Sequence, residues 1–337
     1  MTLRSRRRYA ACMATRKIHD PEHGDANAPG VLRTPLARVD GVWVKLEYLN
    51  PSGSVKDRVA SHVLQNGLRR GTLRAGGEVV EPTSGNAGIA LAYWAKRFGL
   101  LAVVFMPENM TEERKTIIRA HGAQLVLTPE SEGVVGAIRR ARAYANERAG
   151  RFLFDQFDDE AGVEAQAALG REALEQARRQ GIGDFDAVIA GVGTGGTIIG
   201  AGGAIKETHP STRLIAVEPE ASPLVCRQLF ARVCPPPALP PLHDYPMAVC
   251  HLQEGIGDGL VPGIVRRHRA LLDDAVLVSD QEALEETHRL NRAGHPVGPS
   301  SGTNMVVARR LAEGLTVLTF FPDRMDRYRS LPEFKGF

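Results

Sequence analysis

The chain of 337 residues has no long apolar run and few cysteines. Its longest uninterrupted apolar stretch, Leu100 to Met106, has seven residues, whereas a membrane-spanning helix needs about 20. This excludes an integral membrane protein. No C-x-x-C pair occurs among the four cysteines, so neither a disulfide framework nor a zinc ribbon is indicated, and we expect reduced thiols in a cytoplasmic protein. The cysteines are Cys12, Cys226, Cys234 and Cys250.

The chain also lacks a large excess of positive or negative charge. Lys and Arg number 42 against 39 for Asp and Glu, a net charge of +3 that gives no reason to expect nucleic acid. The one biased segment is residues 1–20, which predicts a solvated, disordered tail. A targeting peptide is the alternative, and a start at Met13 would make residues 1–12 an artefact. Six basic residues precede Asp20: Arg4, Arg6, Arg7, Arg8, Arg16 and Lys17.

Glycine, at 35 residues, is abundant where predicted strands run into predicted helices. Short strands alternate with helices, and this alternation predicts an α/β fold with largely parallel sheets. Two such sets, one before about residue 155 and one after about 185, indicate two domains. Segment 235–246 holds six prolines and predicts an extended surface loop, with a docking motif as the alternative. The predicted strands are 77–81, 100–106, 124–127, 187–190 and 214–217, and the predicted helices are 87–98, 134–148, 197–208 and one that Thr111 caps.

The first candidate binding motif is the glycine turn 191–197, between a predicted strand and a predicted helix. Its first six residues read G-x-G-x-x-G, and Glu218 follows Gly196 by 22 residues, where a ribose-binding acid would lie. Bare N–H groups at a helix N-terminus form an anion site, most simply for a phosphate. A dinucleotide site, another phosphate site and a purely structural turn all stay open here.

The second motif is segment 45–58, in which Asn50-Pro51-Ser52-Gly53 predicts a turn and Ser54 a helix N-cap. Lys56 then falls in the first helical turn, where the positive end of the helix lowers the pKa of an amine. A lowered pKa suits a nucleophile or base. A solvated lysine beside Asp57 is the alternative.

The third motif, Pro82-Thr83-Ser84-Gly85-Asn86-Ala87-Gly88, is another strand-to-helix turn. Its hydroxyl, amide and N–H donors suit a carboxylate. A plain capping turn is the alternative.

Together these motifs resemble the fold-type II family of pyridoxal-phosphate enzymes, in its cysteine synthase and cystathionine β-synthase branch. Lys56 lies where that family places its Schiff-base lysine, and Asn86 follows it by thirty residues, as in the branch. Gly193-Thr194-Gly195-Gly196-Thr197 is similar to the family's phosphate loop. The resemblance runs from about residue 32 to 328, and its further landmarks are 106–110, 156–157, 217–219, 254–257 and 299–302.

The resemblance implies a tryptophan synthase β-like fold with two three-layer α/β/α domains of mostly parallel sheet. The smaller, mobile domain would comprise residues 53–160. The larger would comprise 21–52 plus 161–337 and carry the phosphate loop. It also implies a homodimer.

The resemblance also implies a role for each site residue. Lys56 would bind pyridoxal phosphate and later act as the base at the substrate's α-carbon. Asn86 would hydrogen-bond the cofactor ring oxygen. The cofactor phosphate would lie on Gly193, Thr194, Gly195, Gly196 and Thr197, and the substrate carboxylate on Thr83, Ser84, Gly85 and Gln156.

Ser300 matches the residue that faces the pyridine nitrogen, with Ser301 as the alternative. A neutral hydroxyl does not keep that nitrogen protonated, so the ring is a weaker electron sink than one paired with an acid. This favours departure of a β-substituent over transamination.

The implied reaction is β-replacement: O-acetylserine, or O-phosphoserine, loses its leaving group to give an aminoacrylate, and sulfide adds to make L-cysteine. Cystathionine β-synthase, S-sulfocysteine synthase and cysteine desulfhydrase share these motifs and stay open. A non-catalytic regulatory binder, such as a partner of serine acetyltransferase, whose C-terminal tail inserts into the active site of relatives, is a further alternative. Intact Lys56 argues against it.

Several positions depart from the family pattern. Ala87 replaces a common threonine, segment 158–162 replaces an Asn-Pro-Ala-Asn sequence, and Asp258 adds a negative charge close to the site. Segment 226–250 replaces the usual glycine-rich approach to the site, which leaves the donor and the nucleophile open. The spacing of Cys226, Cys234, His243, Cys250 and His251 matches no zinc pattern, so no metal is expected. Haem at Cys12 and His19 is likewise not expected.

Overall fold

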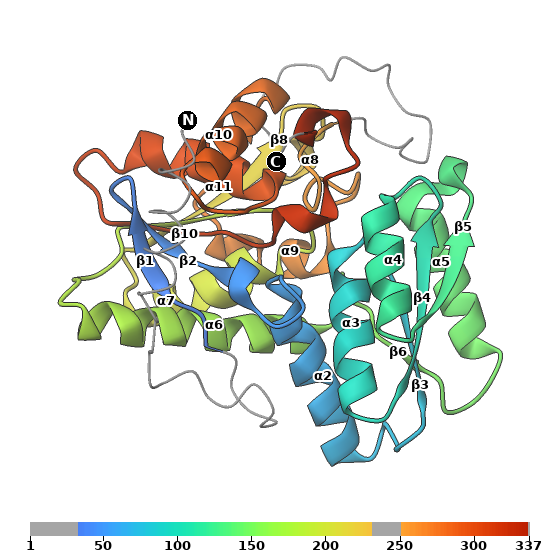
Figure 1. Cartoon of the computed structure of the whole chain (residues 1–337). Coiled ribbons are helices and arrows are strands. Elements are labelled where there is room, and N and C mark those ends of the chain that lie inside the picture. The colour runs from blue at the N-terminus through green and yellow to red at the C-terminus, as the bar shows by residue number, and fades with distance from the viewer. Residues whose placement is uncertain (1–32, 231–250, 336–337) are drawn as a thin grey trace, which may run out of the picture. The chain divides into compact units, whose positions relative to one another are not determined.

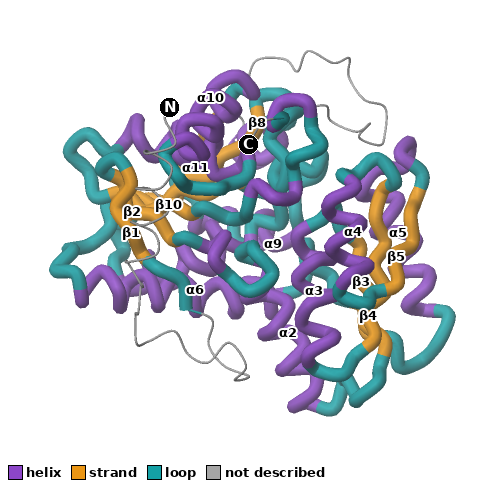
Figure 2. The backbone as a smooth tube through the Cα atoms, viewed as in Figure 1, coloured by secondary structure: helices purple, strands orange, loops and turns teal. Residues whose placement is uncertain are grey.

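The computed structural model describes residues 33–230 and 251–335. Strands and helices alternate along these residues, and the strands form two sheets (Figures 1 and 2). The predicted α/β fold class with mostly parallel sheets is therefore confirmed. Within the described ranges, no helix is both long and apolar enough to cross a membrane. The basic segment 1–20 and the proline-rich segment 235–246 lie outside the described residues.

The smaller sheet has four parallel strands in the order β5-β4-β3-β6. Alternate residues of its strands face opposite layers of helix, as the two-residue period of a strand requires. Val103 packs with Ala137 of α5, whereas Val104 packs with Ile89 of α3. The elements of this region are β3 (Glu78–Pro82), β4 (Leu101–Pro107), β5 (Gln124–Thr128), β6 (Phe152–Leu153), α3 (Asn86–Arg97), α4 (Glu112–Ala120), η2 (Glu130–Glu132) and α5 (Gly133–Asn146).

The larger sheet has six strands in the order β1-β2-β10-β7-β8-β9. Its first two strands form an antiparallel hairpin, and every other pair is parallel. The hairpin turns at Asp40 (φ 48°) and Gly41 (φ 87°), an Asp-Gly pair typical of a tight hairpin with both residues left-handed. The strands are β1 (Leu36–Val39), β2 (Val42–Lys45), β7 (Ala187–Gly191), β8 (Arg213–Pro219), β9 (Asp274–Val278) and β10 (Val317–Phe320).

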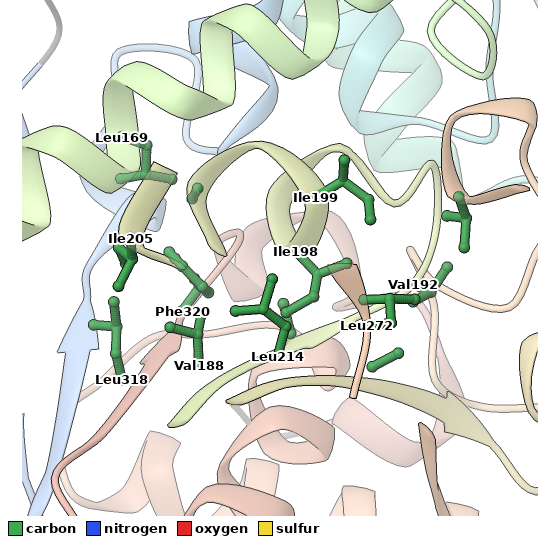
Figure 3. Close-up of a cluster of buried hydrophobic side chains, with 14 of the residues drawn as sticks. Leu169, Val188, Val192, Ile198, Ile199, Ile205, Leu214, Leu272, Leu318 and Phe320 are labelled. Carbon is green, nitrogen blue, oxygen red and sulfur yellow. The ribbon is translucent and has the colours of Figure 1, made fainter. Parts of the chain in front are cut away.

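Helices cover both faces of the larger sheet. On one face Leu169 of α6 and Ile198 of η3 pack with Val188 and Leu214 of the sheet (Figure 3). On the other face α10 and α11 complete a second apolar cluster. The remaining elements are η1 (Glu47–Leu49), α2 (Lys56–Arg70), α6 (Glu160–Arg179), η3 (Thr197–Gly202), α7 (Gly203–Thr208), α8 (Leu224–Phe230), α9 (Gly263–Arg267), η4 (Arg269–Leu271), α10 (Asp280–Arg292), α11 (Pro299–Leu311), η5 (Met325–Arg327) and η6 (Pro332–Phe334).

Two sheets are consistent with two domains, and the boundaries at 53–160 and at 21–52 plus 161–337 stay a prediction. The chain from Thr34 onward forms one compact unit. Residues of both sheets meet within that unit, as the site below shows.

Two predicted N-caps differ in detail from the prediction. Thr111 occupies the N-cap position of α4, but its Oγ1 donates to the Arg327 carbonyl at 2.9 Å. The N-cap position of α2 is Val55, and Ser54, one residue earlier, still accepts from the Lys56 backbone N–H through its Oγ at 3.4 Å.

The expectation of reduced thiols is wrong for Cys226. This buried residue in α8 is disulfide-bonded in the structure. The other cysteines, Cys12, Cys234 and Cys250, lie outside the described residues. The expectation rested on cellular compartment and Cys spacing, and neither shows which thiols the fold brings together.

Candidate active site

Lys56 is the first residue of α2, and the preceding turn fixes its position. Gly53 adopts a left-handed conformation (φ 89°), which favours glycine there. The Asp57 carboxylate folds back to accept hydrogen bonds from the Ser52 backbone N–H and hydroxyl and from Trp94 Nε1. Asp57 therefore stabilises the turn. The alternative interpretation, a solvated Lys56 paired with Asp57, does not hold.

The Lys56 amine points toward the glycine turn of the other sheet. Its Nζ donates to Thr194 Oγ1 at 3.4 Å. Burial lowers the pKa of Lys56, and the charges of Asp258, Glu81 and Asp323 partly oppose that shift. The predicted lowering is confirmed, with desolvation as its largest cause rather than the helix terminus.

The glycine turn after β7 is a cradle of backbone N–H groups. Those of Gly193, Thr194 and Gly195 donate to no acceptor within the described part of the chain. A Cβ at Gly193 would lie 2.7 Å from the Gly255 carbonyl oxygen, and one at Gly195 (φ 80°) would lie 2.1 Å from Val265 Cγ2. Only glycine fits at either position, so the turn is built for close approach of its backbone to an anion.

The predicted cofactor residues line one cavity, which is open to solvent. Ser300, the second residue of α11, is among them. The alternative, Ser301, is buried outside this lining, and its Oγ has no partner within the described ranges. The predicted residues that line this cavity are Lys56, Asn86, Gly193, Thr194, Gly195, Gly196, Thr197 and Ser300.

The predicted substrate residues line an adjoining cavity, which is also open to solvent. It shares Lys56, Asn86, Thr194 and Gly255 with the first cavity. Thr83 Oγ1 accepts from the Gly85 N–H at 2.9 Å and shapes the turn. The predicted residues that line this cavity are Thr83, Ser84, Gly85 and Gln156.

Asn86 joins the two sheets. Its Nδ2 donates to Asp323 Oδ2 at 2.6 Å, and the same oxygen accepts from the Tyr328 hydroxyl. The second Nδ2 hydrogen and the buried Oδ1, which has no partner in the described ranges, are left to meet a bound group.

Two further residues of the site were not predicted. Arg114 of α4 is buried against Gly85, pairs with Glu254 at 2.7 Å and lines the substrate-side cavity. Glu81 is fully buried at the end of β3. Arg114 looks like any charged residue of a surface helix, whereas Glu81 carried a signal as an acid that follows two valines and leads directly into the loop. Asp258, singled out for its charge, also lines the cavity.

Glu218 does not face the cavity, which removes the ribose-binding acid of the dinucleotide alternative. Its two carboxylate oxygens accept from the N–H groups of Val225 and Cys226, each at 2.8 Å. Residues 33–230 and 251–335 contain no group of three side chains able to hold a metal.

Comparison with known proteins decides the family. Residues 28–323 match the family model described as pyridoxal-phosphate dependent enzyme. This chain belongs to that family. The enzyme is 38% identical to a cysteine synthase of Staphylococcus aureus over 297 residues, which cover 86% of this chain and 88% of the relative. Pyridoxal phosphate is therefore its cofactor.

Solved structures agree. An O-acetylserine dependent cystathionine β-synthase from Helicobacter pylori is 33% identical with a TM-score of 0.76, covering 90% of this enzyme and 95% of that chain. A hydrogen sulfide-producing enzyme from Fusobacterium nucleatum is 31% identical with the same TM-score, covering 87% and 84%. The enzyme is thus of the fold-type II, cysteine synthase type.

The residues present fit this cofactor. Three backbone N–H groups that have no acceptor among residues 33–230 and 251–335 suit its phosphate. An amine whose pKa is lowered by burial lies beside them and suits its aldehyde.

Proposed function

We propose that this enzyme makes L-cysteine from O-acetylserine, or O-phosphoserine, and sulfide by β-replacement. One observation carries the proposal: Lys56 lies between a cradle of free N–H groups and a polar strand-to-helix turn, in two cavities that share it. The similarity to a cysteine synthase at 38% identity supports it.

Different residues would hold different parts of the cofactor. Lys56 would hold the cofactor, Gly193 to Thr197 its phosphate, Asn86 its ring oxygen and Ser300 its pyridine nitrogen. When bound, pyridoxal phosphate supplies the electron sink that lets the α-proton and the β-substituent leave. Neutral Lys56 Nζ then accepts the α-proton, and burial, which lowers the pKa of this amine, favours the free base.

The donor amino acid is positioned by its carboxylate. Thr83, Ser84, Gly85 and Gln156 offer hydroxyl, backbone and amide donors at one end of the substrate-side cavity. The positive end of α3 starts at Asn86 beside them and favours an anion. This fixes the α-carbon near Lys56.

Asp258 favours a second candidate among the nucleophiles. Burial raises the pKa of Asp258, opposed by the charges of Lys56 and His251, so the carboxylate is a stronger base than in water. Such a group repels a dianion such as thiosulfate, but it accepts the proton of a neutral thiol. A homocysteine-type thiol, and hence cystathionine formation, is the second candidate, while S-sulfocysteine synthesis is disfavoured.

A product assay tests the proposal. Purified enzyme with O-acetylserine is mixed separately with sulfide, homocysteine and thiosulfate, and the amino-acid products are separated and quantified. We expect cysteine from sulfide at the highest rate, and none from a Lys56→Ala control. Cystathionine as the main product would select the second candidate, and no product from any nucleophile would contradict β-replacement. The homodimer, the serine acetyltransferase partner and the cytoplasmic location stay predictions.

A further inference from the structure

A buried acid lies behind the substrate-side turn and contacts one of its predicted ligands. Glu81, fully buried at the end of β3, has its Oε1 2.6 Å from Gln156 Nε2, and the same Nε2 lies 3.4 Å from the Pro82 carbonyl oxygen. Its Oε2 is also buried and has no hydrogen-bond partner within the described residues. Gln156 is itself buried and lines the cavity with Lys56.

This environment does not support a charged carboxylate. An ionised group with a single neutral amide as partner loses far more hydration than one hydrogen bond restores. A separation of 2.6 Å is also short for N–H···O and ordinary for O–H···O. Both observations favour a protonated Glu81. Its O–H finds an acceptor at this contact when the Gln156 amide is reversed, with Oε1 in the place of Nε2.

Two charged groups act on Glu81 from neighbouring elements. Burial raises the pKa of Glu81 well above its usual value, and Asp155, which follows β6, raises it further. Lys56, at the start of α2, opposes them. Arg142 of α5 pairs with Asp155 at 2.5 Å and weakens its influence. Burial therefore dominates.

The protonation state of Glu81 decides which end of the Gln156 amide faces the cavity. A carboxylate would hold the amide nitrogen and turn the amide oxygen toward the substrate, where it would repel a carboxylate. A carboxylic acid donates to the oxygen and leaves the two N–H groups to the cavity.

We propose that Glu81 is a positioning residue that stays protonated, donates to Gln156 Oε1 and thereby directs Gln156 Nε2 at the carboxylate of the donor amino acid. This deepens the proposed function and rests on its assignment of the substrate-side cavity. Affinity for the donor then falls as rising pH ionises Glu81, because the amide reverses.

Infrared difference spectroscopy tests the protonation state without any substrate. The spectrum of wild type minus Glu81→Gln should contain a carboxylic-acid C=O band at neutral pH. The matched control Glu78→Gln, on the same strand but ion-paired with Arg151 at 2.7 Å, should remove carboxylate bands only. A carboxylate band in place of the acid band for Glu81 would overturn the proposal whatever the enzyme's substrate.

Donor affinity tests the positioning role. The visible spectrum of the holoenzyme is titrated with O-acetylserine, and with L-serine as a second amino acid bearing the same carboxylate, across pH 6 to 9. Glu81→Gln still offers an N–H to Gln156 and should retain affinity but lose the alkaline decline. Glu81→Leu offers no donor and should weaken affinity about tenfold, toward the roughly 10- to 100-fold loss expected for Gln156→Leu.

The amino group of the substrate titrates equally with every variant, so its effect on the pH dependence of affinity cancels when each variant is compared with wild type. If Glu81→Gln weakens donor affinity as much as Glu81→Leu, the residue is structural and the proposal fails. A response to L-serine but not to O-acetylserine would refute only the donor assignment and leave the role of Glu81 open to the same test.

Discussion

Two strand-to-helix turns lie on either side of Lys56, one from each sheet, and they offer donors of different kinds. The turn after β7 presents bare backbone N–H groups, and its glycines pack against backbone and a branched side chain. The turn after β3 presents side-chain donors, and Gly85 packs against the flexible side chain of Arg114. We therefore propose that the first holds the resident cofactor phosphate, and that the second, whose neighbour is free to move, binds the exchanging substrate.

Lys56 is common to both turns, so its removal should have the largest effect. Lys56→Ala removes the amine that would hold the cofactor and accept the α-proton, and we expect turnover to fall by roughly 10³-fold or more. Steady-state product formation measures it. Turnover within tenfold of wild type would show that the two turns do not serve one reaction.

Alanine scanning of the two turns separates their roles. Gly193→Ala places Cβ 2.7 Å from the Gly255 carbonyl oxygen, which has little freedom to move. We expect about 10- to 100-fold weaker pyridoxal phosphate binding, as for overpacking of about 1–3 kcal/mol. Gly85→Ala meets Arg114 Cδ at 2.6 Å and should instead raise the KM for the donor several-fold, with cofactor affinity retained.

Cofactor titration of the apoenzyme and donor kinetics of the holoenzyme measure these effects. Gly183→Ala is the matched control, because its Cβ would meet nothing within 4 Å. The contrast between the turns breaks down if both variants lose cofactor to the same extent.

Asp258 tests the charge of the substrate side. Asp258→Asn removes a base and a negative charge while keeping the shape. We expect use of a neutral thiol to drop about tenfold and use of thiosulfate to rise several-fold. Competition assays with the two nucleophiles give the ratio directly, and an unchanged ratio would show that Asp258 does not face the nucleophile.

A smaller effect concerns Glu218, the buried acid at the end of β8 and the counterpart of Glu81. Burial raises the pKa of Glu218 to about 7, opposed by backbone N–H donors. Since the unfolded carboxyl titrates near 4.5, the free energy of unfolding should fall by up to about 3 kcal/mol as pH rises from about 4.5 to 7.

Glu218→Gln should flatten this pH dependence, whereas Glu220→Gln, at an exposed position, should not. Urea unfolding of the holoenzyme at pH 5 and pH 8 gives the comparison. Equal slopes for wild type and Glu218→Gln would mean that the carboxyl is already ionised at pH 5.

Much of this fold and site can be predicted from the sequence, because strands, turns and binding loops are determined by residues close together in the chain. Apolar runs broken by glycine turns located β4 and β7 to within one residue, and the three motifs named most residues that line the cavities. What escaped prediction depends on distant partners. Lys45 is fully buried and pairs at 2.6 Å with Glu172, which is 127 residues away in the sequence. No local sequence pattern indicates such a pair. Arg114 escaped for the same reason, because its partner Glu254 lies 140 residues away in the sequence.

The most direct test of the account is a visible absorbance spectrum of the purified protein, before and after O-acetylserine is added without sulfide. We predict a yellow protein whose band moves to longer wavelength with O-acetylserine and returns when the correct nucleophile is supplied. A yellow band indifferent to O-acetylserine would contradict the proposed donor and point to serine or cysteine instead. A protein that stays colourless after pyridoxal phosphate is added would contradict the assignment of the cofactor site itself.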